Sequence, residues 1–164
     1  MSFKIKTILC AIDLSENSEL VLMAAVREAA AHDTEVQVLH IIPSFDAAMA
    51  MPIVSFMGEK RFSQLMEEKK KETEATIRKK IDNLKKRMLE NEPGGGIDRI
   101  KDIHVYKGDV VIEILNMATR LKADILVMGA HGKGITEHTF VGSVTRKVMR
   151  RIRVPVLLIP GAVR

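Results

Sequence analysis

Short apolar runs alternate with segments whose apolar residues recur every 3.6 positions, and this alternation restricts the chain to a fold of β-α units. Runs of strand length cover residues 7–12, 35–42, 100–106, 125–128 and 155–159, and helical periodicity covers residues 16–32, 59–90, 109–121 and 143–152. Strands that are separated by helices pair in parallel, because a crossover returns the chain to the same edge of the sheet. We therefore predict an α/β protein with an open five-stranded parallel sheet and helices on both faces.

Both periodicities fail between residues 43 and 62, where methionine and aliphatic residues accumulate. We predict that residues 43–62 form an irregular, Met-rich excursion before the long helix. The clearest buried stripe of that helix is Ile77, Ile81, Leu84 and Met88. With 164 residues and 46% hydrophobic residues, the chain fits one domain that spans residues 1–164.

Glycines gather directly after the fourth apolar run. Gly129 and Gly132 follow it, and Gly142-Ser143 opens the last helical segment. Glycine allows backbone amides to point into a concave loop at positive φ and allows a phosphate to approach closely. The unpaired amides at a helix start also favour an anion. We interpret this segment as a phosphate-binding loop, with a plain surface turn as the alternative.

A carboxylate follows the first apolar run, at Asp13. In open α/β sheets, ligands bind beyond the carboxyl ends of the strands where the strand order reverses. If the first and fourth strands are neighbours, Asp13 and the glycine loop face one crevice. The alternative is that Asp13 only caps the helix that follows it.

Composition excludes several classes of protein. The net charge is +5, but the lysines of residues 69–87 are interleaved with glutamates, and one Tyr and no Trp are available for base stacking, so we expect no nucleic-acid partner.

No segment has the roughly 20 apolar residues that cross a bilayer, so we expect no membrane insertion. The first residues lack the apolar region of a signal peptide, which predicts a cytoplasmic protein. Cys10 lies inside an apolar run, so we expect a buried, reduced thiol.

No constellation demands a catalytic or metal-binding role. His131, Glu137 and His138 lack further ligands in helical register, so we predict no protein-held metal. His40 and His104 lie in or beside strands, and we expect them to be hydrogen-bonded core or rim residues.

Taken together, these landmarks resemble the universal stress protein family and specifically its nucleotide-binding branch. That branch has a glycine, two residues, a second glycine, nine residues, and then glycine with serine or threonine. Gly129, Gly132, Gly142 and Ser143 match this pattern without a gap. The resemblance also includes residues 8–15, 39–41, 108–109 and 154–159, so it covers nearly the whole chain.

The resemblance implies a Rossmann-like sheet of the adenine nucleotide alpha hydrolase type with strand order 3-2-1-4-5, bound ATP, and a homodimer formed through the last strand. Asp13 would accept a hydrogen bond from the ribose or adenine, and the backbone near Ile41 would read the adenine edge. Mg²⁺ would bridge phosphate oxygens without a protein ligand. Ala11 stands where many members carry proline, which should loosen the base pocket. The nucleotide-binding residues carried over are Ala11, Ile12, Asp13, Ile41, Met128, Gly129, His131, Gly132, Lys133, Gly142, Ser143, Val144 and Thr145.

Three functional hypotheses follow. In the first, the protein is a stress-response regulator or sensor in which ATP occupancy orders residues 129–141 and sets the surface shown to an unknown protein partner. In the second, it is a slow ATPase or autophosphorylating enzyme, with Lys133 neutralising charge and His131 or Glu137 orienting water. In the third, it binds no nucleotide, and the Met-rich excursion of a dimer docks a partner or a membrane surface.

Overall fold

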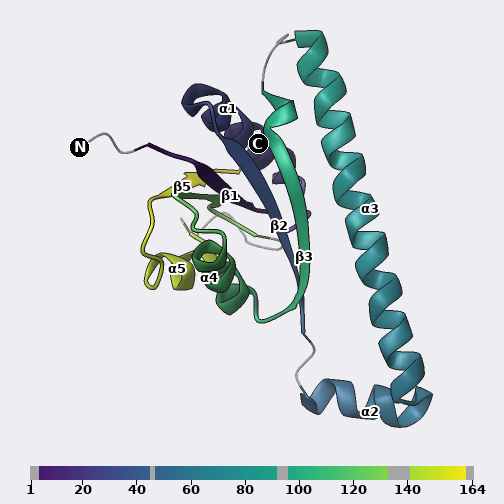
Figure 1. The fold of residues 1–164 in the computed structure, drawn as a ribbon. Helices are drawn as coiled ribbons and strands as arrows, with labels where there is room; N and C mark the ends of the chain where they lie inside the picture. Colours follow the sequence, from purple (N-terminus) through teal and green to yellow (C-terminus); the bar gives the residue numbers. More distant parts are fainter. Residues whose placement is uncertain (1–3, 45–46, 92–95, 133–140, 162–164) are drawn as a thin grey trace.

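Five parallel strands form one sheet in the order β3-β2-β1-β4-β5, which confirms the predicted fold class and strand order (Figure 1). The computed structural model describes residues 4–44, 47–91, 96–132 and 141–161. The strands are β1 (Thr7–Ala11), β2 (Glu35–Pro43), β3 (Ile100–Gly108), β4 (Ile125–Gly129) and β5 (Val156–Ile159). The central strands are nearly continuous apolar runs because helices cover both of their faces.

Two hydrophobic clusters fill the space between the sheet and its helices. On one face, α1 (Ser18–His32) and α3 (Glu59–Asn91) pack on alternate strand residues such as Ile8, Val38 and Val127. On the other face, α4 (Val110–Arg120) and α5 (Ser143–Met149) pack on strand residues such as Leu9 and Leu39. A short 3-10 turn, η1 (Ile97–Arg99), leads from α3 into β3.

The predicted irregular excursion at residues 43–62 is wrong, because residues 47–57 form a second helix, α2 (Ala47–Met57). This helix has no charged residue, and Pro52 lies inside it. The prediction missed this helix for two reasons. Its residues are apolar on every side, so they show no amphipathic period, and a proline usually indicates the end of a helix. Gly58 joins α2 to α3 at a φ of +84°, a left-handed conformation that favours glycine.

The arm formed by α2 and the first half of α3 projects from the body of the protein (Figure 1). The buried residues of α3 are Ile77, Leu84 and Met88, with Ile81 packed against them, as the predicted stripe requires. On α2, Phe56 is 93% exposed, and Met49 and Met51 are also exposed. This exposed face is the feature on which the third functional hypothesis depends. No helix in the described ranges combines the length and the apolar character needed to cross a membrane.

Candidate functional site

The sheet order brings the carboxyl ends of β1 and β4 side by side. Ala11, the last residue of β1, pairs with Met128 of β4, and Gly129 ends β4. The chain leaves β1 toward β2 on one side of this junction, and β4 and β5 lie on the other side, so the junction is the topological switch point of the sheet. The predicted meeting of Asp13 with the glycine loop is therefore present.

The Asp13 carboxylate is held by one of its oxygens. Its Oδ1 accepts a hydrogen bond from the Ser15 amide (2.9 Å) and a longer one from the Ser18 hydroxyl (3.4 Å). Its Oδ2 is buried and has no hydrogen-bond partner. Asp13 is not the helix cap, because α1 begins at Ser18 and Asn17 occupies the N-cap position. Burial of an unpaired carboxylate oxygen is unfavourable, so this atom is the part of the site that best fits a missing donor.

Gly132 lies directly beside that oxygen. A Cβ at residue 132 would lie 3.3 Å from Asp13 Oδ2, a tight contact, so glycine leaves the most room next to the carboxylate. The other described side-chain atom that is buried without a partner is the Thr34 hydroxyl oxygen. Thr34 comes just before β2 and therefore lies at the amino ends of the strands, opposite to Asp13. The unpaired carboxylate therefore lies at the adjacent carboxyl ends of β1 and β4.

The backbone directly after Asp13 is strained. Leu14 has a φ of 62°, in the left-handed region that costs a branched residue about 1–2 kcal/mol. The other described non-glycine residues with positive φ are Asp33, the C-cap of α1, and Lys122, just beyond α4. Leu14 ends no helix. Strain of this kind is common where a binding side chain must be held in place.

The described glycines of the loop, Gly129, Gly132 and Gly142, do not have positive φ, which corrects one part of the sequence interpretation. Among the described glycines, positive φ occurs only at Gly58 and Gly96. A Cβ at Gly129 would instead meet the His131 carbonyl oxygen at 3.1 Å. The Gly142 amide donates to the Ala130 carbonyl (2.8 Å), so the two ends of the loop are joined.

Helix α5 begins next to this loop with free amides. Its first intrahelical bond runs from the Arg146 amide to the Gly142 carbonyl (3.0 Å), so the amides of Ser143, Val144 and Thr145 have no acceptor within the helix. The Thr145 hydroxyl donates to the Gly129 carbonyl (3.0 Å) and is buried. Its side chain therefore fixes α5 to β4, and only its amide can serve a ligand.

The end of β2 lies on the side of β1 that is away from β4. The Ile12 amide donates to the Leu39 carbonyl (2.9 Å), and the His40 Nδ1 lies 2.8 Å from the Ile12 carbonyl oxygen. Backbone groups of a strand alternate between its two sides. The amide and carbonyl of Ile41 therefore point to the same side as those of Leu39, just past the end of β1. His40 is a hydrogen-bonded core histidine, as predicted, and His104 likewise contacts the Gln37 side chain (2.8 Å).

The site prediction reaches beyond the described residues. Lys133, Glu137 and His138 lie outside them. Half-buried His131 lies in the loop beside Gly132 and is engaged in an interaction of its own. In the described ranges, no group of three or more His, Cys, Asp or Glu residues is arranged to hold a metal ion.

Sequence reasoning missed three parts of the site. Ser18 holds Asp13, Leu14 carries the strain, and Ala130 joins the loop to both α5 and β5 through its carbonyl and its amide. Each contributes through hydrogen bonding or backbone conformation and not through a distinctive side chain, so no sequence pattern marked them.

Cys10 lies in the middle of β1, close to the crevice but buried on the α1 face. Burial raises the pKa of its thiol to about 12. The unfolded thiol ionises near its ordinary pKa, so this residue stabilises the fold fully below that pH and loses the contribution as the pH rises toward 12. We predict no iodoacetamide labelling of the folded protein at pH 8 and complete labelling in urea, measured by mass spectrometry. Rapid labelling without urea would contradict this prediction.

Known proteins resemble this chain in sequence and in fold. A family model of the universal stress protein family matches residues 4–160. A universal stress protein of Methanocaldococcus jannaschii is 31% identical over 164 residues and covers 97% of each chain. A solved structure of that protein has a TM-score of 0.66 at 26% identity, covering 98% of this chain and 99% of that one.

Two further solved structures share the fold at lower identity. A universal stress protein in complex with cAMP has a TM-score of 0.63 at 21% identity and covers 97% of this chain and 99% of its own. A universal stress protein from Archaeoglobus fulgidus in complex with dAMP has a TM-score of 0.56 at 18% identity, with 96% and 98% covered.

Proposed function

This chain belongs to the universal stress protein family, and we propose that it binds ATP with Mg²⁺ and acts as a regulatory protein whose signal is nucleotide occupancy. The observation that carries the proposal is the buried, unpartnered Oδ2 of Asp13, which lies beside Gly132, where any side chain would crowd it. A ribose hydroxyl is a donor of the right kind for this oxygen. Hydrogen bonds to charged groups contribute about 1.5–3 kcal/mol each, so one such bond would be a large part of the binding energy.

The other walls of the crevice suit the remaining parts of the nucleotide. The amide and carbonyl of Ile41 would pair with the adenine edge. The free amides of Ser143, Val144 and Thr145 would receive the phosphates, since a helix start favours an anion. Mg²⁺, when bound, would be held mainly by phosphate oxygens and water. The adenine nucleotides named for the two relatives, cAMP and dAMP, support the same ligand class here.

Titration calorimetry with Mg-ATP tests the proposal. We expect a single-site binding heat, together with a rise in melting temperature that grows with ATP concentration because ligand binds only the folded state. Parallel titrations with AMP and GTP report the phosphate and base preference. Neither heat nor thermal protection at millimolar Mg-ATP would rule out the proposed function.

Hydrolysis is the competing hypothesis, and it depends on Lys133, His131 or Glu137. Phosphate release over several hours distinguishes the two. A regulatory protein should give release close to background while ATP protects residues 129–141 from proteolysis. Steady turnover that follows ATP affinity would favour the enzyme.

We also propose a homodimer through β5. This strand lies at the edge of the sheet, and its four residues are uncharged and half-buried in the single chain. An apolar edge strand without charged side chains is a ready template for pairing with another strand. Light scattering should give twice the monomer mass at micromolar concentration, and a monomer mass at those concentrations would contradict the pairing.

A further inference from the structure

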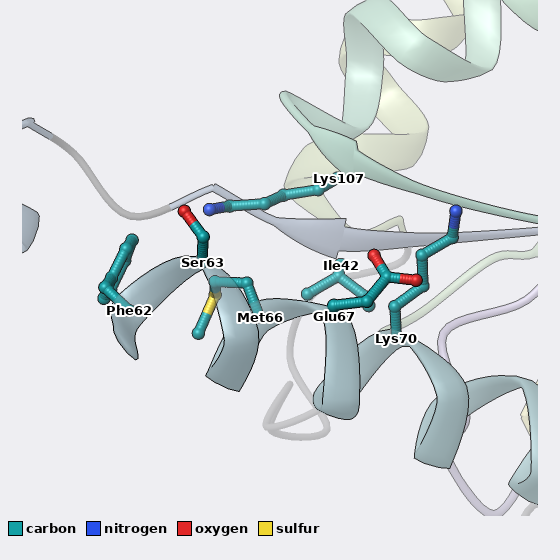
Figure 2. A pocket seen from close by; sticks show the side chains of 7 residues that line it. All are labelled: Ile42, Phe62, Ser63, Met66, Glu67, Lys70 and Lys107. Carbon is teal, nitrogen blue, oxygen red and sulfur yellow. The ribbon is translucent and has the colours of Figure 1, made fainter. Parts of the chain in front are cut away.

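A cavity of about 230 Å³ lies between α3 and the carboxyl ends of β2 and β3 (Figure 2). We propose that it binds a small monocarboxylate with an apolar body, as a ligand separate from the nucleotide. Ligands of drug size occupy cavities of roughly 300–1,000 Å³, so this cavity suits a smaller molecule.

The floor of the cavity is apolar. Ile42 points from β2 toward α3, and its side chain is 8% exposed. Phe62 and Met66 of α3 complete this surface and are half-buried. A flat ring and a flexible thioether adapt to apolar groups of different shape. The floor therefore favours an aliphatic or aromatic body.

The charged groups of the cavity favour a single negative charge. Lys107 reaches in from β3, with its Nζ 5.3 Å from the centre of the Phe62 ring. Glu67 and Lys70 point from α3 toward the sheet (Figure 2). Among the described residues, none of these three side chains forms an ion pair. Two ammonium groups and one carboxylate leave one positive charge, which matches a monocarboxylate, whereas Glu67 would repel the second charge of a phosphate.

The position of the cavity separates it from the nucleotide crevice. Ile42 pairs with Lys107 in the β2–β3 register, on the side of the sheet away from β4. Successive strand residues face opposite ways, so Ile41 packs in the α4 cluster while Ile42 packs in the α3 cluster. The second site thus lies at the carboxyl ends of the strands, as the nucleotide site does, but beside β2 and β3.

Methyl NMR of the full-length protein with ¹³C-methyl methionine tests the proposal, with 3-phenylpropionate as the probe. We expect the Met66 signal to shift saturably with a dissociation constant on the order of millimolar, as for a fragment-sized ligand. The signals of Met49 and Met51, on the exposed face of α2, should stay in place. The neutral analogue 3-phenylpropan-1-ol should bind at least about fivefold more weakly, because it lacks the charge.

Two lysine variants assign the anion contact. K107Q should weaken 3-phenylpropionate about fivefold, whereas K71Q, on α3 next to Lys70 but outside the cavity lining, should bind like the wild type. The proposal is overturned if Met66 does not shift, if Met49 and Met51 shift equally with it, or if K107Q binds unchanged. The readout at Met66 needs no nucleotide, so failure of ATP binding and failure of this site are separate results.

Discussion

The variant D13N is expected to bind Mg-ATP about 10- to 100-fold more weakly than the wild type while folding normally. Asparagine keeps an oxygen for the Ser15 amide and the Ser18 hydroxyl, which Asp13 Oδ1 now serves. It replaces the unpartnered Oδ2 with an amide group that cannot accept a hydrogen bond. The loss of one charge-assisted hydrogen bond, about 1.5–3 kcal/mol, corresponds to that range of affinity.

Titration calorimetry gives the affinity, and urea denaturation without nucleotide gives the stability. We expect the stability of D13N to equal or exceed that of the wild type, because a neutral group takes the place of a charged carboxylate at a position with a buried, unpartnered oxygen. D82N, an exposed change on α3 with the same chemistry, should alter neither quantity. Equal ATP affinity for D13N and wild type would show that Asp13 does not contact the nucleotide.

The G132A variant tests the same space from the other side. Its Cβ would lie 3.3 Å from Asp13 Oδ2, closer than most such contacts. A ribose hydroxyl could not then occupy the position in front of the oxygen. Because the Asp13 carboxylate stays, weak binding by both variants would place the ligand between these two residues.

The parts of the fold that could be predicted are those in which a buried face produces a regular pattern of apolar residues along the sequence. Strands covered on both sides are apolar runs, and α3 shows its stripe because its other faces are charged. α2 left no trace, since a helix without a polar face has no amphipathic period.

The position of the candidate site in the fold could be predicted from the sequence, but its hydrogen-bond geometry could not. Asp13 follows the end of β1 and Gly129 ends β4, so the pairing of these two strands brings them together. The unpaired state of Oδ2 depends on how Ser15, Ser18 and Gly132 fold around one carboxylate, and no pattern along the chain contains that geometry. The second cavity is hidden for the same reason, because Ile42, Phe62 and Lys107 come from three separate elements.

The I77A variant should lower the free energy of unfolding by about 2–5 kcal/mol, because it removes a fully buried side chain from the cluster shared by α1, α3 and the sheet. F56A should change it by no more than about 0.5 kcal/mol, although a larger side chain is truncated, because Phe56 is 93% exposed. Phe56 lies on the arm, whereas Ile77 lies just beyond it on α3, where the helix packs on the body of the protein.

The comparison has a physical basis in how α3 is attached. This helix is about 50 Å long, yet its buried residues all lie in its second half, so the arm before residue 77 is held to the body mainly through the turns that follow. Urea denaturation followed by far-ultraviolet circular dichroism gives the free energy of unfolding of both variants, and in a thermal scan I77A should melt roughly 5–15 °C below the wild type. If F56A were as destabilised as I77A, Phe56 would have to be covered in solution, and the exposed arm would instead be an interface between copies.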